Sequence, residues 1–235
     1  MNQLDRQLGR RQAGFTLVEI AIVLVIIGLL LGGILKGQEM ITQAKIKNIV
    51  NDLNGMSAAI YSYQDRYRAL PGDELSATTE ARWGAGAAYG GDGNGTFCTG
   101  STCGSPTTFK YNEPPAATPA ATTHETQLFW MHLRLSGFVP GATSGAQALQ
   151  QPGNAVNGML GVQTTGMGFS TNIICTSNLP DKVAIAVDTQ VDDGSSATGG
   201  VRGQAQSAPS PDVASTAATG YQETGTNTYL LCKNL

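Results

Sequence analysis

An apolar run near the N-terminus constrains this chain more than any other feature. Residues 15–35 read FTLVEIAIVLVIIGLLLGGIL, and Glu19 is the single charge among these 21 residues. At about 1.5 Å per residue, a helix of this length spans about 30 Å, the thickness of a bilayer's hydrocarbon core. The run is also longer than the apolar core of a secretory signal peptide, about 7–15 residues. The sequence therefore predicts a membrane-spanning helix over residues 15–35 that stays in the mature protein.

The basic residues before the run predict its orientation. Arg6, Arg10 and Arg11 precede it, and basic residues beside a membrane helix favour the cytoplasmic side. We therefore expect the rest of the chain to lie outside the cytoplasm.

The helical pattern continues beyond the membrane segment. Apolar residues recur at steps of mostly three or four, as on one face of a helix; they are Ile46, Ile49, Val50, Leu53, Met56, Ile60, Tyr63 and Tyr67. No proline interrupts residues 15–70, and Pro71-Gly72 is a stop signal. The sequence predicts one long helix over residues 15–70, followed by a globular head over residues 71–235.

The head shows shorter and weaker patterns. Residues 72–122 and 194–220 are rich in turn-forming and small residues and are predicted to be loops. A capping-box pattern, Thr122 with Glu125, predicts a short helix that Gly137 ends. The predicted strands cover residues 172–175, 183–188 and 229–233.

Four cysteines lie in the exported part, where an oxidising compartment favours disulfides. They are Cys98, Cys103, Cys175 and Cys232, and three connectivities are open. Pairing of neighbours would join Cys98 to Cys103 and Cys175 to Cys232.

Charge and motifs argue against two function classes. After Pro71 there are six basic and twelve acidic residues, with no basic cluster, so we expect no nucleic-acid partner. No nucleophile motif or phosphate-binding loop is present, so we do not expect an enzyme. His124 and His132, the two histidines, have no second ligand at metal spacing and are predicted to have surface or capping roles.

The start of the apolar run resembles a known processing motif. Gly14-Phe15-Thr16-Leu17-Val18-Glu19, after a short basic leader, is similar to the cleavage and methylation motif of type IV prepilins. The resemblance implies that residues 1–14 are a leader, that a prepilin peptidase cuts between Gly14 and Phe15, and that the new amine of Phe15 is methylated. It also implies that Glu19 pairs with the N-terminal amine of a neighbouring subunit, which offsets the cost of burying a carboxylate in an apolar helix.

The resemblance extends more loosely into the head. Residues 69–73, ALPGD, look like a turn of many pilin-like proteins. The implied fold is α+β, with the long helix packed on an antiparallel sheet. In this fold a disulfide between Cys175 and Cys232 would connect the last strand to an earlier strand. We therefore predict the disulfides Cys175–Cys232 and Cys98–Cys103.

The implied function is that of a structural subunit of a type IV pilus or pilus-like filament. Its partners would be other copies, related pilins, the prepilin peptidase and inner-membrane lipid before assembly. The implied location is the bacterial inner membrane, with the head outside, and then an extracellular or periplasmic filament. Lys36 stands where many major pilins have a proline, so major pilin, minor pilin and type II secretion pseudopilin stay open. A membrane-anchored binding protein or adhesin that never polymerises is the alternative from another class.

Calcium is a further candidate, because major pseudopilins bind it in a head loop. Oxygen ligands on turns are what the ion prefers, and the candidates are Asp92, Asn94, Asp188, Asp192 and Asp193. Neither stretch has the EF-hand pattern, and Asp-Gly and Asn-Gly are common tight-turn residues. The prediction therefore favours hairpin turns and no cofactor over a calcium site.

Overall fold

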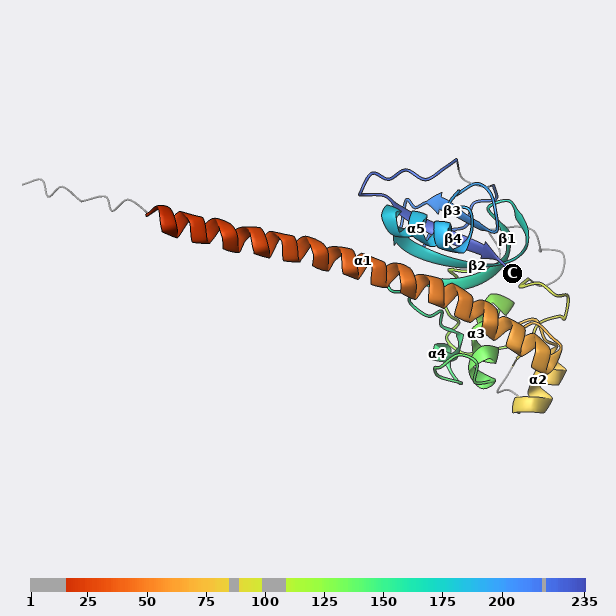
Figure 1. Cartoon of the computed structure of the whole chain (residues 1–235). Helices are drawn as coiled ribbons and strands as arrows, with labels where there is room; N and C mark the ends of the chain where they lie inside the picture. The colour runs from red at the N-terminus through yellow and green to blue at the C-terminus, as the bar shows by residue number, and fades with distance from the viewer. Residues whose placement is uncertain (1–15, 85–88, 99–108, 217–218) are drawn as a thin grey trace, which may run out of the picture. The chain divides into compact units, whose positions relative to one another are not determined.

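The structure, a computed structural model, describes residues 16–84, 89–98, 109–216 and 219–235. Its elements follow in the order α1 (Leu17–Tyr67), α2 (Ser76–Trp83), α3 (Glu125–Leu135), α4 (Ala146–Leu149), β1 (Leu160–Gly166), β2 (Phe169–Pro180), α5 (Asp181–Val191), β3 (Val201–Ala205) and β4 (Thr228–Asn234) (Figure 1). The chain divides into two compact units, Met1–Gln43 and Ala44–Leu235. The leader and head boundaries inferred from the sequence, at residues 14 and 71, stay predictions.

The first half of α1 has the properties of a membrane helix. Among the residues described, α1 is the one helix long and apolar enough to cross a bilayer, with a mean hydropathy of 2.8 in its most apolar stretch. None of that stretch is buried, and side chains such as Leu17, Leu24 and Leu29 are exposed. A core helix of a soluble domain would bury one face. The prediction of a long N-terminal helix with an apolar span is confirmed.

The second half of α1 forms one side of the head core. Its buried residues follow the predicted apolar face and are Ile46, Ile49, Leu53, Met56, Ala59, Ile60 and Tyr63. They belong to one cluster with Phe129 and Trp130 of α3, Ile174 of β2 and Leu231 of β4. Fully burying a large apolar side chain contributes about 1.5–3 kcal/mol, so this face holds helix and head together.

A four-stranded antiparallel sheet forms the other part of the head. Its strand order is β1-β2-β4-β3, and Figure 1 shows these strands grouped beside the second half of α1. Neighbouring residues point to opposite faces, since Ile174 joins the α1 core while Ile173 and Cys175 join a second cluster with Tyr111 and Val213. The α+β fold class is thereby confirmed.

The ALPGD turn ends α1 by its backbone conformation. The helix stops at Tyr67, and Arg68 follows with a φ of 58°. Gly72 has a φ of 90°, and a Cβ there would lie 2.4 Å from the carbonyl oxygen of Glu125. Only glycine fits such a position, so the predicted stop is confirmed and the turn lies directly against α3.

One predicted strand is wrong. Residues 183–188, VAIAVD, lie in helix α5. Val183, Ala184 and Val187 are buried, which is a helical spacing of one, three and four residues rather than the alternation of a strand. The β-branched residues misled the prediction because tertiary packing overrides local strand preference.

Three further head predictions need correction. The predicted loop 194–220 contains the edge strand β3 and places Val213 in a core cluster. The predicted loop 72–122 contains α2. The predicted capping box is absent, because α3 begins after His124, and Glu125 accepts a hydrogen bond from the backbone N–H of Asp92 instead.

Strand β1 was not predicted, since LGVQTTG has little of the alternation that marks a strand.

Candidate assembly site and head surface

The start of α1 is closed by a reciprocal pair of side chains. The backbone N–H and the hydroxyl of Thr16 both donate to Oε2 of Glu19, at 2.8 Å each. In return, the backbone N–H of Glu19 donates to the Thr16 hydroxyl at 3.3 Å. This is the capping-box arrangement, which satisfies backbone donors that the first turn of a helix leaves unpaired.

The capping pair leaves part of Glu19 available. Its side chain is exposed, and Oε1 accepts no hydrogen bond from any residue that the structure describes. Gly14 and Phe15, the predicted cleavage and methylation residues, lie outside the described residues. The structure thus places the predicted assembly carboxylate at the exposed start of α1, with one oxygen open to a partner.

In the head, the ALPGD turn is fixed by the loop that follows α2. The Asp73 carboxylate accepts from the backbone N–H groups of Asn94 at 2.9 Å and Gly95 at 2.8 Å. The backbone N–H of Gly93 donates to the Asp73 carbonyl at 2.8 Å. The GDGNG segment is therefore a tight turn wrapped around one buried carboxylate.

Glu74, the next residue, forms a buried ion pair. Its oxygens accept from both terminal nitrogens of Arg82, at 2.6 and 2.8 Å, and from the hydroxyl of Tyr63 at 2.7 Å. Burial alone would raise the pKa of Glu74, but the hydrogen bonds from Arg82 and Tyr63 bring that pKa below its usual value. A bidentate pair of this kind is strong and directional. It joins α2 to the turn after α1, and the Tyr63 hydroxyl connects Glu74 to α1 itself.

His132 of α3 links the same turn to the rest of the head. Its Nδ1 accepts from the backbone N–H of Gly72 at 2.9 Å, and its Nε2 lies 2.7 Å from the carbonyl oxygen of Tyr89. These partners require a neutral ring with the proton on Nε2. Burial lowers the pKa of His132 to about 4. The predicted surface or capping role is wrong for this histidine.

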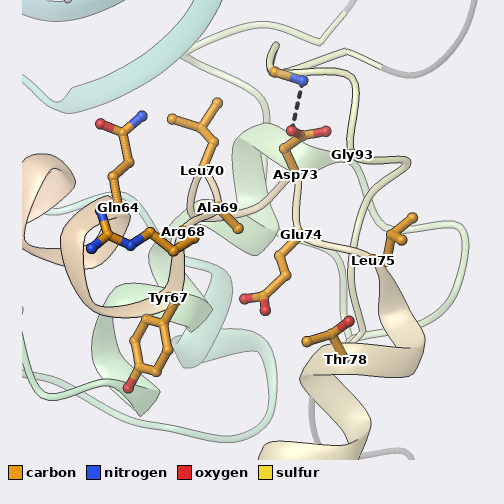
Figure 2. Close-up of a pocket in the computed structure, with 11 residues that line it drawn as sticks. Gln64, Tyr67, Arg68, Ala69, Leu70, Asp73, Glu74, Leu75, Thr78 and Gly93 are labelled. Carbon is orange, nitrogen blue, oxygen red and sulfur yellow. Dashed lines mark hydrogen bonds between the residues drawn. The ribbon is translucent and has the colours of Figure 1, made fainter.

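Two adjoining hollows lie beside this turn. The larger, about 640 Å³, is lined by Tyr67, Arg68, Leu75 and the backbone around Gly93 (Figure 2). The second, about 490 Å³, is lined by Tyr61, Asn172 and Leu235, and the two share Gln64, Leu70 and Gly95. Together they form an open surface hollow at the end of α1.

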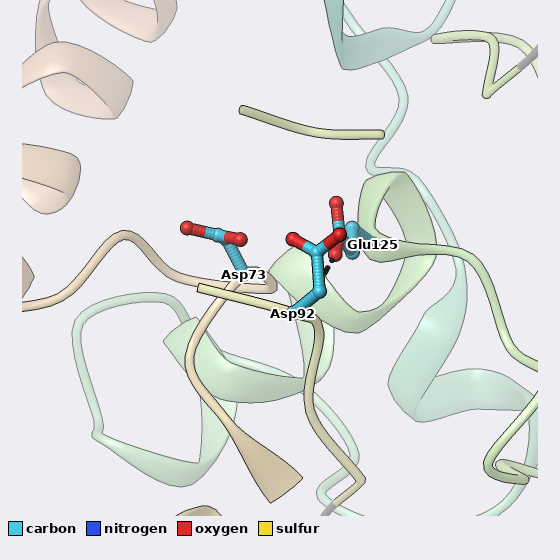
Figure 3. A group of neighbouring side chains, drawn as sticks. All are labelled: Asp73, Asp92 and Glu125. Atoms are coloured by element: carbon cyan, nitrogen blue, oxygen red, sulfur yellow. Dashed lines mark hydrogen bonds between the residues drawn. The ribbon is translucent and has the colours of Figure 1, made fainter. Parts of the chain in front are cut away.

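The predicted calcium ligands lie in two acidic groups. Asp92 is grouped with Asp73 and Glu125 (Figure 3). Asn94 lies beside this group: its backbone N–H donates to the carboxylates of Asp73 and Asp92, and its side-chain Oδ1 accepts from the backbone N–H of Thr96. Sequence reasoning missed Asp73 and Glu125, although the ALPGD motif contains the first of them.

The second group consists of Asp188, Asp192 and Asp193. Protein donors already serve these carboxylates: Asp188 accepts from the Tyr221 hydroxyl and from Gly194, Asp192 from Val201, and Asp193 from Ser195 and Thr198. Burial, together with the neighbouring carboxylates, raises the pKa of Asp188 to about 6. Calcium binding at either group stays a prediction.

A disulfide joins the two central strands. Cys175 of β2 bonds to Cys232 of β4, and the two residues stand directly opposite each other in the sheet. Both lie on the face of the sheet away from α1, in the cluster with Tyr111. The predicted pair is therefore present. Cys98 is not a free thiol, and its predicted partner Cys103 lies outside the described residues.

Comparison with known proteins identifies the N-terminal segment. Residues 9–35 match the family model of the prokaryotic N-terminal methylation motif. No curated protein and no solved structure matched the chain. The matched stretch contains Glu19 and the first turns of α1, so motif and geometry coincide. The chain therefore carries the type IV pilin and pseudopilin signature, that of a structural precursor which prepilin peptidase processes for assembly with other pilins.

Proposed function

We propose that this chain is a subunit of a type IV pilus or pilus-like filament, made as a membrane-anchored precursor with its head outside the inner membrane. The observation that carries the proposal is Glu19, a carboxylate inside the methylation motif at the start of an exposed apolar helix. A charge at such a position is costly in lipid, and it is tolerated where a partner compensates it. The proposed partner is the methylated N-terminal amine of Phe15 in a neighbouring copy.

The capping geometry supports this assignment. Thr16 occupies only Oε2 of Glu19, so the same carboxylate can close its own helix and accept an amine from another copy at Oε1. The exposed apolar side chains of the first half of α1 suit lipid before assembly and like helices afterwards. Type II secretion pseudopilins share this motif, so the proposal covers both kinds of filament.

The substitution Glu19→Gln tests the proposal. Glutamine also serves in a capping box, so the helix start is kept while the charge is removed. Leader cleavage and membrane insertion should survive. Filaments should fail, because an amine left without its buried partner costs about 3–5 kcal/mol. The measurement is the amount of subunit in sheared filaments against membrane fractions, in cells without a native copy.

Thr16→Val is the matched control. It removes the hydroxyl from the cap but keeps the Glu19 charge and the backbone N–H of residue 16. The helix start loses about 1 kcal/mol, and filaments should still form. Wild-type filament yield from Glu19→Gln would reject the assembly role and favour a membrane-anchored binding protein instead.

A further inference from the structure

A further cavity, of about 340 Å³, lies in the surface of the head. Among the described residues it shares no lining residue with the hollows at the end of α1. We call it the outer cavity; its lining includes Phe109, Lys110, Asn112, Glu113, His124 and Asp212. Cavities that bind small molecules have volumes of roughly 300–1,000 Å³, so the outer cavity has the size for a single small ring.

Two segments far apart in the chain form this cavity, and both are anchored on the face of the sheet away from α1. Tyr111 and Val213 are buried in the cluster on that face. The Tyr111 hydroxyl donates to the carbonyl of Pro211 at 2.9 Å, and the amide of Asn112 donates to the carbonyl of Ser210 at 2.9 Å. The lining side chains that adjoin these residues are therefore held in place before any ligand binds, which lowers the cost of binding.

Two ion pairs supply the lining with both donors and acceptors. The Nζ of Lys110 lies 2.6 Å from one carboxylate oxygen of Asp212, and the other oxygen accepts from the Asn112 amide at 3.1 Å. His124 is paired with Glu113 in the same way. These four charged side chains keep between 23% and 47% of their surface exposed. Since an ammonium has three donors and a carboxylate about four acceptor sites, each pair has hydrogen-bonding capacity left for a ligand.

Phe109 adds an apolar surface to this polar lining. Its half-buried ring meets His124 edge to face, with ring centroids 4.5 Å apart. The φ of Phe109 is 55°, which is rare for a bulky residue. Such backbone conformations cluster at ligand-binding sites, so the position of this ring also favours a binding role.

The charges of the described lining do not favour an anion. Glu113 and Asp212 bring two negative charges and Lys110 brings one positive charge, and a protonated His124 only balances the sum. A phosphate or a carboxylate would meet two carboxylates without an excess of positive charge. Neutral hydroxyls suit the lining better, because a hydroxyl both donates and accepts. One hydroxyl can accept from Lys110 while its neighbour donates to Asp212.

We propose that the outer cavity binds one neutral sugar residue. Two adjacent hydroxyls of the sugar pair with Lys110 and Asp212, and its C–H face lies on the ring of Phe109. A purely apolar ligand would instead bury the charged groups without partners, which is costly. This binding is a function beyond the proposed filament role, and its residues lie in the head rather than on α1.

Saturation-transfer NMR on the detergent-solubilised full chain tests the proposal. The probes are the methyl glycosides of glucose, galactose, mannose, fucose and N-acetylglucosamine, with N-acetylneuraminic acid as the anionic comparison. At least one neutral glycoside should bind, and Lys110→Met and Phe109→Ala should each weaken its affinity about tenfold or more. Lys182→Met is the matched control and should leave the affinity unchanged, because Lys182 forms an exposed ion pair with Glu223 outside the outer cavity.

Circular dichroism checks the fold of each variant, and Lys110→Met decides the result if Phe109→Ala does not fold. The proposal is overturned if no neutral glycoside binds, if Lys110→Met binds as tightly as the wild type, or if N-acetylneuraminic acid binds more tightly than every neutral probe. None of these measurements needs filaments. Their failure therefore leaves the proposed filament function to be judged by Glu19→Gln alone.

Discussion

At the scale of single residues, His132 makes the head sensitive to acid. Its pKa is lowered to about 4 by burial, against about 6.5 in an unfolded chain. Between these values the unfolded state binds a proton that the folded state does not, so stability falls as pH falls from 6.5 to 4. Over this pH range the loss in unfolding free energy amounts to about 3 kcal/mol. We expect His132→Gln to destabilise the protein by about 3 kcal/mol less at pH 4 than at pH 7.

The difference between wild type and variant is the quantity to measure. Asp188 acts in the opposite direction: its pKa is raised to about 6, so the folded state gains stability as pH falls from 6 towards the usual value near 4. Subtracting the two unfolding curves cancels that contribution. Urea unfolding of the detergent-solubilised chain can be followed by the fluorescence of Trp83 and Trp130. His124→Gln is the control and should keep the acid loss; a pH-independent effect of His132→Gln would contradict a neutral buried ring.

The roles of Glu19 and His132 differ in how far the sequence could predict them. Glu19 is isolated in an apolar run, so the expectation that it has a partner follows from the local cost of burying its charge. The role of His132 depends on Gly72, 60 residues earlier in the chain, and on Tyr89. No local pattern reports such partners, which the packing of α3 against the turn brings together.

At the scale of elements, the Cys175–Cys232 bond should stabilise the sheet mainly through the unfolded state. The cysteines are 57 residues apart, and closing a loop of that length is worth about 4 kcal/mol in the chain-entropy model. The strands are already paired by backbone hydrogen bonds on both sides of the bond. We expect Cys175→Ala/Cys232→Ala to lower the unfolding free energy by about 2–4 kcal/mol and to keep the fold, as judged by circular dichroism and urea unfolding.

The control is Cys98→Ala/Cys103→Ala. The predicted pair closes a far shorter loop, so its removal should cost about 2 kcal/mol less than removal of the other bond. Equal losses from the two double variants would show that loop length does not set the contribution of these bonds. Peptide mapping without reductant would check the Cys98–Cys103 pairing itself.

The element that the sequence predicted most completely, α1, has a long and regular apolar pattern. The buried face of α1 was predicted because its spacing repeats over many turns. β2 and β4 were predicted over part of their length, because Ile173, Leu230 and their neighbours are apolar. α5 was misread and β1 and β3 were missed, because there the neighbouring strands and side chains, rather than a local apolar pattern, decide the conformation.

At the scale of the whole molecule, the chain consists of two units whose surfaces differ in polarity. The unit Met1–Gln43 contributes an exposed apolar helix, whereas the unit Ala44–Leu235 buries its apolar residues in the head core. The sequence predicted this contrast from composition, because the apolar run and the polar head are separate along the chain. The proposed filament would cover the exposed apolar surface of the first unit.

The last prediction concerns the mature chain. We expect filaments to contain a chain that begins at methylated Phe15, because only a free amine at that position can satisfy Glu19 of a neighbour. Removing the leader takes away Asp5 and the three arginines Arg6, Arg10 and Arg11, so the formal net charge moves from −3 to −5.

Intact mass spectrometry should show the loss of residues 1–14 and the gain of one methyl group, and isoelectric focusing should show a more acidic protein. Cells without the prepilin peptidase are the control and should accumulate the full chain in the membrane. Filaments built from chains that retain Met1 would show that assembly does not use the amine of Phe15.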